Sequence, residues 1–88
     1  MYKLAVKESL DRKFKKLRKK DRETLLLIHK KVQQILDNPY RFKPLRKPLQ
    51  HKRRVHIGGS FVLIYEVNEE EKLVTLVEFE HHDSVYKI

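Results

Sequence analysis

The chain has 88 residues, of which 40% are hydrophobic and 38% charged, with two Gly, three Pro and no Cys. This length suits one modest hydrophobic core, and the apolar share excludes collagen-like and disordered classes. The lack of cysteine excludes a disulfide framework, a thiolate zinc site and a cysteine nucleophile. No apolar run approaches the roughly 20 residues of a transmembrane helix, and the N-terminus lacks a signal-peptide pattern. We therefore expect one domain over residues 1–88 with a cytoplasmic location and no membrane contact.

The charge is divided unevenly along the chain. Residues 1–54 contain 19 Lys/Arg and five Asp/Glu, a balance of +14, whereas residues 55–88 contain two and seven, a balance of −5. A concentrated positive field favours nucleic acid or an acidic protein as partner, because cations that neutralise phosphates release bound counterions. The alternative is a heavily charged, solvated surface, but such a surface usually mixes both signs.

The N-terminal half is predicted to form a short strand and two helices. Alternating side chains over residues 2–7 predict the strand. A helix is expected from an N-cap at Ser9 to about Lys20, and a second helix from an N-cap at Asp21 to the stop at Asn38-Pro39. With almost no linker between them, the two helices are expected to form a hairpin.

The C-terminal half is predicted to form three strands. A strand over about 52–57 leads into Gly58-Gly59-Ser60, the strongest hairpin signal in the chain. Residues 61–67 form a nearly continuous apolar run, as expected of a central strand covered on both faces, and residues 73–79 form the last long strand. Apolar residues at helix and strand spacing are expected to be largely buried: Phe14, Leu17, Leu25, Ile28, Val32, Ile35, Leu63, Tyr65, Val74 and Leu76.

These elements predict an α+β fold in the order β-α-α-β-β-β. The helical hairpin should pack on one face of a mainly antiparallel four-stranded sheet.

A first candidate site is the second strand of this order. Alternation places Lys52, Arg54 and His56 on one face, with Arg53 and Val55 on the other. Because a row of cations is costly under the helices, we expect it on the opposite sheet face, where it could hold phosphate. An edge strand that uses charge to avoid aggregation is the alternative. The basic run at positions 12–20 remains open between a phosphate-binding helix, a docking site for an acidic partner and a solvated helix face.

A second candidate site is the C-terminal group His81, His82, Asp83 and Tyr86. Without an HxH or HxxxH spacing, it does not predict a metal site, and we expect no cofactor. Histidine can act as a general acid or base, and tyrosine can orient a nucleotide or donate a proton. Together with the basic strand, this group suits RNA cleavage without a metal, in which one group deprotonates the 2′-hydroxyl and another protonates the 5′-oxygen.

The whole chain resembles the RelE/ParE superfamily of type II toxin–antitoxin toxins, and most of all its RelE branch. The order of elements agrees, and four sequence segments occur in the family's order. These are the stretch from Lys43-Pro44-Leu45 to Leu49, residues 54–58 (RVHIG), residues 61–67 (FVLIYEV) and residues 81–86 (HHDSVY).

The resemblance implies a toxin that cleaves mRNA in the ribosomal A site and is neutralised by a RelB-like antitoxin. It implies a monomer alone and a hetero-oligomer with the antitoxin. Catalytic roles are implied for Arg54, His81, His82 and Tyr86. RNA-binding roles are assigned to Lys47, Lys52, Arg53 and His56.

The sequence departs from the family pattern at two positions. Val62 stands where an arginine is common, and His82 replaces the second residue of a common His-Arg pair. Three interpretations therefore stay open: an endoribonuclease with weakened or rearranged catalysis, a non-enzymatic toxin that binds DNA gyrase in the manner of ParE, and a plain RNA-binding module.

Overall fold

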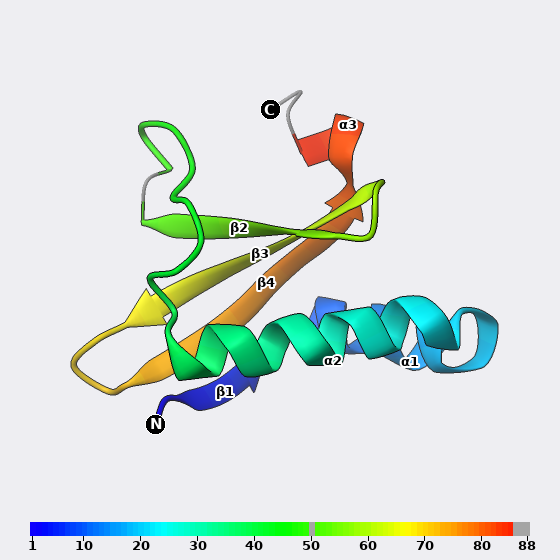
Figure 1. Cartoon of the computed structure of the whole chain (residues 1–88), viewed down its shortest axis with the longest axis horizontal. Coiled ribbons are helices and arrows are strands. Elements are labelled where there is room, and N and C mark those ends of the chain that lie inside the picture. Colours follow the sequence, from blue (N-terminus) through cyan, green and yellow to red (C-terminus); the bar gives the residue numbers. More distant parts are fainter. Residues whose placement is uncertain (50, 86–88) are drawn as a thin grey trace.

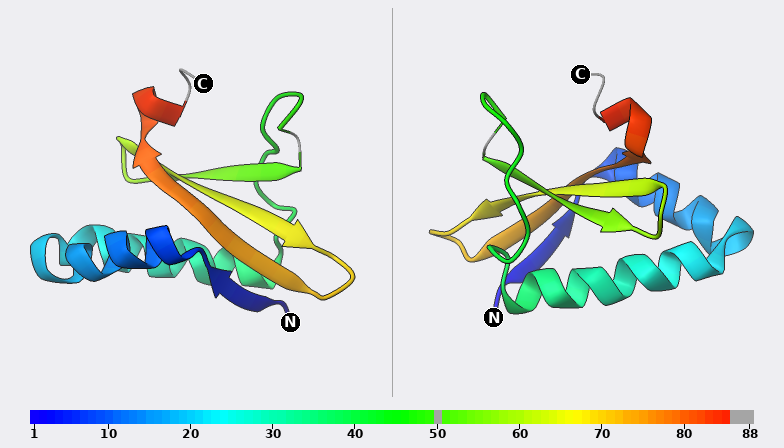
Figure 2. Two further views of the ribbon diagram at one scale, coloured as in Figure 1. Left: turned by 180° about the vertical axis from the view of Figure 1, so that it is seen from behind. Right: turned by 45° about the horizontal axis from the view of Figure 1, so that its top comes forward.

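The computed structural model describes residues 1–49 and 51–85 (Figure 1). Its elements in chain order are β1 (Lys3–Val6), α1 (Glu8–Lys20), α2 (Arg22–Asp37), β2 (Lys52–Ile57), β3 (Phe61–Asn68), β4 (Leu73–His81) and α3 (His82–Val85). The strands form one sheet in the order β1-β4-β3-β2. β1 is parallel to β4, and the other pairs are antiparallel. The helical hairpin lies on one face of this sheet, so the predicted fold class is confirmed (Figure 2).

The start of α1 differs from the prediction. The helix begins at Glu8, so Ser9 lies inside its first turn, and Lys7 occupies the N-cap without a side-chain cap. The Lys7 amide donates to the Leu76 carbonyl at 3.0 Å, which continues the β1–β4 pairing directly up to the helix. This backbone bond decides where the chain leaves the sheet, and a local preference for serine at the cap does not override it.

The predicted boundaries of α2 are confirmed. The Asp21 carboxylate accepts from the Thr24 amide at 3.1 Å and from the Thr24 hydroxyl at 2.6 Å, and both bonds lower the pKa of Asp21. The helix ends at Asp37, before Asn38 and Pro39. None of the helices in the described part of the chain is long and apolar enough to span a membrane.

The main core lies between the helices and the sheet. Seven of the ten residues predicted to be buried are buried, whereas Phe14, Leu17 and Leu25 are half-buried. The first two of these three still pack against the core, at its margin under α1. Six further buried residues of the hydrophobic core were not among the ten: Leu10, Val55, Ile57, Val62, Ile64 and Phe79.

The buried phenol of Tyr65 connects the central strand to the loop after α2. Its hydroxyl donates to the Pro39 carbonyl at 2.6 Å, and burial raises the pKa of Tyr65 to about 12. A second anchor lies on the β3–β4 turn, where the Glu69 carboxylate accepts bonds from Tyr2, Tyr40 and Lys72. These bonds, that from Lys72 first, lower the pKa of Glu69 to about 2. The N-terminus and the loop are thus held to one end of the sheet.

The β3–β4 ladder contains a one-residue shift that changes which side chains face the helices. Ile64 pairs with Glu78 but the next residue, Tyr65, pairs with Leu76, so Val77 is the additional residue of a bulge. Before the bulge, Val74 and Leu76 lie in the helix-side core, and after it Phe79 does. The bulge therefore keeps Phe79 in the core and turns Glu78 and Glu80 to the opposite face.

Candidate functional site

The outer face of the sheet, opposite the helices, has its cations on β2. Val55 and Ile57 are in the helix-side core, so alternation directs Arg54 and His56 to the outer face. His56 is exposed and Arg54 is half-buried. The predicted orientation of this pair is confirmed.

Apolar side chains of β3 lie beside these cations. His56 pairs with Val62 and Arg54 with Ile64, and directly opposed residues of an antiparallel pair share a face. Val62 and Ile64 form a second buried cluster, covered in part by Leu45 of the loop. The apolar run of β3 is therefore buried on both faces, as predicted. Val62, where the resemblance to the family implies an arginine, is fully buried.

Carboxylates on β4 complete the outer face, and sequence analysis did not predict them there. Glu80 pairs with Val62 and Glu78 with Ile64. On the outer face, Val62 and Ile64 of β3 therefore lie between these carboxylates and the cations of β2. Lys13 of α1 contacts the Glu80 carboxylate and donates to the Phe79 carbonyl at 3.2 Å. In the sequence, the spacing of the large apolar residues changes from two (Val74 to Leu76) to three (Leu76 to Phe79). This change is the signal from which the outward direction of Glu78 and Glu80 could have been predicted.

The structure brings His82 to the cationic strand. The His82 amide donates to the Ser60 carbonyl at 2.8 Å, which fixes the start of α3 beside the β2–β3 hairpin. The His82 and His56 rings lie 5.9 Å apart between centroids, at 44° to one another. The fold thus places His82 of α3 beside β2, the strand that carries Arg54 and His56, although the two elements are distant in sequence.

His81 does not join this group. Its ring packs edge-on against Phe61 at 5.7 Å, on the side of the sheet that carries Phe79. Its Nδ1 accepts from the Asp83 amide at 3.2 Å. His81, to which the resemblance gives a catalytic role beside Arg54 and His82, therefore lies apart from them, because adjacent residues leaving a strand point to opposite sides.

Arg53 is also separated from the outer face. Its guanidinium donates to the Phe42 carbonyl at 2.7 Å and lies over the Tyr40 ring, 4.9 Å from the centroid. It therefore anchors the loop after α2 to β2 and does not share the outer face with Arg54 and His56.

The loop after α2 runs along the outer edge of β2. The Leu45 amide donates to the Lys52 carbonyl at 2.8 Å, and the Arg54 amide donates to the Lys43 carbonyl at 3.1 Å. The Lys52 ammonium lies 3.9 Å from the Glu66 carboxylate and is half-buried. Lys47 is exposed on the same loop. The remaining predicted catalytic residue, Tyr86, lies outside the described residues.

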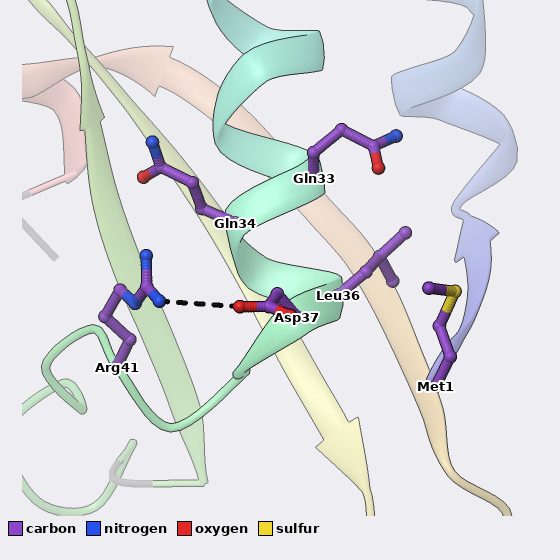
Figure 3. A pocket seen from close by; sticks show the side chains of 6 residues that line it. All are labelled: Met1, Gln33, Gln34, Leu36, Asp37 and Arg41. Carbon is purple, nitrogen blue, oxygen red and sulfur yellow. Dashed lines mark ion pairs between the residues drawn. The ribbon is translucent and has the colours of Figure 1, made fainter.

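A surface hollow of about 340 Å³ lies elsewhere, at the C-terminal end of α2 (Figure 3). Its lining includes Met1, Leu36 and the ion pair of Arg41 with Asp37, whose charged atoms are 3.6 Å apart. Because no lining residue belongs to β2 or α3, this hollow is separate from the outer face. Within residues 1–49 and 51–85, no group of three or more metal-ligating side chains comes together.

Comparison with known proteins identifies the family. A family model described as the ParE toxin of the type II toxin–antitoxin system parDE matches residues 3–86. The chain belongs to the RelE/ParE superfamily of type II toxins. A relative named "Putative toxin RelE4", from Methanocaldococcus jannaschii, is 46% identical over 99% of this chain and 93% of its own.

Solved structures support the fold of the toxin. The YoeB/ParE toxin from Agrobacterium tumefaciens superposes with a TM-score of 0.81 at 14% identity, over 91% of this chain and 98% of that one. The toxin–antitoxin complex RelBE of E. coli gives 0.77 at 19% identity, over 90% and 94%. At these identities the likeness concerns the fold alone, and the resemblance noted from the sequence motifs is confirmed at the level of the superfamily.

Proposed function

We propose that this toxin is an endoribonuclease that cleaves mRNA on the ribosome, with His56, His82 and Arg54 as its reactive groups. The observation that carries the proposal is the pair of imidazoles formed by His56 on β2 and His82 on α3, whose ring centroids are 5.9 Å apart. Imidazole exchanges protons near neutral pH, so two of them can supply the base and the acid that RNA cleavage needs.

The reaction needs no group beyond these side chains and the RNA. One neutral imidazole takes the proton of the 2′-hydroxyl, and the 2′-oxygen attacks the adjacent phosphorus. The bond from phosphorus to the 5′-oxygen breaks, and the other imidazole, in its protonated form, gives its proton to that oxygen. The products are a 2′,3′-cyclic phosphate and a 5′-hydroxyl, and Arg54 stabilises the charge that develops on phosphorus.

Lys47 and Lys52 are proposed to hold the RNA backbone next to this group. Lys52 lies on β2, two residues before Arg54, and Lys47 is exposed on the loop whose Lys43 and Leu45 bond to the edge of β2. The ribosome and mRNA are proposed as partners from superfamily membership, and the basic N-terminal region suits both. An acidic, RelB-like antitoxin is the proposed inhibitor, because the first 54 residues carry a balance of +14.

A gyrase-binding toxin of the ParE type is the second candidate, favoured by one observation. Val62 is fully buried where an arginine could offset phosphate charge, so the outer face has one cation fewer for nuclease chemistry. Such a toxin would need no proton transfer at His56 and His82.

The deciding experiment combines two assays on the purified toxin. Mapping of 5′ ends on ribosome-bound mRNA should show new ends within the A-site codon, and a supercoiling assay should show no inhibition of gyrase. Gyrase inhibition without any mRNA cleavage would replace the nuclease with the second candidate. The absence of both activities would leave binding alone and refute both toxin mechanisms.

A further inference from the structure

Helix α1 carries a stripe of cations on the side of the molecule away from the outer face. Leu10 is buried in the core between the helices and the sheet, and the side of α1 opposite to it faces solvent. Arg12, Lys16 and Lys19 follow one another on that side at i, i+4 and i+7, and all three are exposed. The turn after α1 projects beyond the sheet, which leaves the end of the stripe accessible (Figure 1).

The charge of this stripe is not compensated within the fold. Lys15 lies 3.5 Å from the Asp11 carboxylate, and Lys13 contacts Glu80. By contrast, across the described part of the chain no carboxylate lies within ion-pair distance of Arg12, Lys16 or Lys19. Like charges three and four residues apart destabilise a helix. The stripe therefore opposes the stability of α1 in the free protein, and an anionic partner would remove that repulsion.

The side chains around the stripe distinguish between two kinds of anionic partner. A protein interface needs buried apolar or aromatic anchors at its centre. The large apolar side chains exposed in the described residues lie on other elements, and none is on α1: Met1, Leu4, Leu26, Leu27, Tyr40 and Leu49. A nucleic-acid backbone needs only cations at a repeated spacing.

The spacing of the stripe suits a phosphate backbone. With a rise of about 1.5 Å per residue, its three cations span roughly 10 Å along the helix axis, within reach of successive phosphates of one strand. We infer that Arg12, Lys16 and Lys19 form a second RNA-binding surface, which holds the backbone of structured RNA. The inference rests on the proposed function in so far as RNA is the partner, but it involves no chemical step.

This second surface lies on the opposite side of the sheet from Arg54 and His56. A single RNA strand that occupies the outer face does not reach it without passing around the domain. The toxin would therefore contact two RNA segments at once, the strand to be cleaved on the outer face and a structured RNA along α1. Such a double contact suits an enzyme that works inside a large RNA assembly.

The test uses the full chain, a fluorescent 16-base-pair RNA duplex as probe, and binding anisotropy between 50 and 200 mM NaCl. The double variant Lys16→Gln/Lys19→Gln removes two stripe cations, and Lys3→Gln/Lys30→Gln removes two exposed lysines of other elements as a charge-matched control. Each lost phosphate contact lowers the slope of log affinity against log salt by about 0.7 to 0.9. We expect a decrease of roughly 1.5 for the stripe variant and little change for the control.

Equal decreases in both variants, or none in either, would overturn the inference. A second probe, polyglutamate, represents an acidic protein. If the stripe variant loses binding to polyglutamate while the salt dependence of its RNA binding is unchanged, the partner is an acidic protein and the inference is also overturned. Thermal melting checks that both variants fold. Stripe-dependent binding by a toxin that never cleaves mRNA would refute the proposed function alone.

Discussion

The imidazole rings of His56 on β2 and His82 on α3 lie 5.9 Å apart between centroids, while His81, one residue before His82, packs against Phe61. Neighbouring histidines are thereby given different surroundings. His82 shares the outer face with the cations of β2, and His81 is directed to the side of the helices. Of the two neighbouring histidines, His82 is therefore the one that we propose acts together with His56 on one phosphodiester.

The two adjacent histidines should therefore differ in their effect on activity. We expect His82→Gln to lower the rate of cleavage of ribosome-bound mRNA by about 100-fold, as is typical when a general acid or base is lost. His81→Gln, which leaves the His56–His82 pair in place, should stay within about threefold of the unmodified protein. Single-turnover cleavage with mapped 5′ ends measures both, and equal losses would contradict the assignment.

The neighbouring arginines of β2 provide a second contrast. Arg54→Ala should reduce cleavage at least about tenfold with little change in melting temperature, because it removes a cation that stabilises the transition state. Arg53→Ala should lower stability by about 1 kcal/mol and leave cleavage largely intact, because it removes the bond to the Phe42 carbonyl. Cleavage rates and chemical denaturation of both variants decide between these roles. The assignment fails if Arg53→Ala is the more damaging change to activity.

The core prediction concerns the central strand. Leu63 is fully buried between the helices and the sheet, so truncation to Ala should lower the unfolding free energy by about 2–5 kcal/mol. Chemical denaturation measures this loss, with Leu26→Ala on the exposed side of α2 as the matched control. A loss below about 0.5 kcal/mol at Leu63 would contradict its central place in the core.

Tyr65 should make stability depend on pH in the alkaline range. Burial raises its pKa from 10.0 to about 12, so the folded state binds the phenolic proton more tightly than the unfolded state does. Its contribution is fully present below pH 10 and is lost as the pH rises towards 12. Tyr65→Phe should remove this part of the pH dependence. It should also lower stability at neutral pH by about 1–3 kcal/mol, because the Pro39 carbonyl loses its donor. Urea denaturation between pH 7 and 11 tests both effects, and an unchanged alkaline slope would contradict the assignment.

Antitoxin binding should depend on salt. The positive field of the N-terminal region should accelerate association with an acidic antitoxin, so the association rate should fall at least about tenfold between 20 and 150 mM NaCl. Stopped-flow fluorescence measures the rate, and an uncharged osmolyte at matched viscosity is the control. A rate that does not respond to salt would remove the electrostatic basis for this partner.

The sequence by itself determined the order of the two long helices and the four strands, and the orientation of β2. Helical and alternating spacings of apolar residues are local properties of the sequence. A strand with Val55 and Ile57 on one face is stable only when that face is turned towards the core. Consequently the direction of Arg54 and His56 followed from the residues of β2 alone. The end of α2 followed in the same way, because the residue before Pro39 is sterically excluded from the helix.

The tertiary structure decided which C-terminal side chains meet β2. Alternation counted from Val74 and Leu76 would place Glu78 and Glu80 under the helices, but the bulge at Val77 reverses this order from Phe79 onward. That extra residue depends on the register with β3, which the β4 sequence does not specify on its own. The β3–β4 pairing ends at His81, and the next residue, His82, lies beside His56. The bond from the His82 amide to the Ser60 carbonyl holds it in this position. Pairing between strands, a non-local interaction, thus determined which histidine belongs to the candidate site.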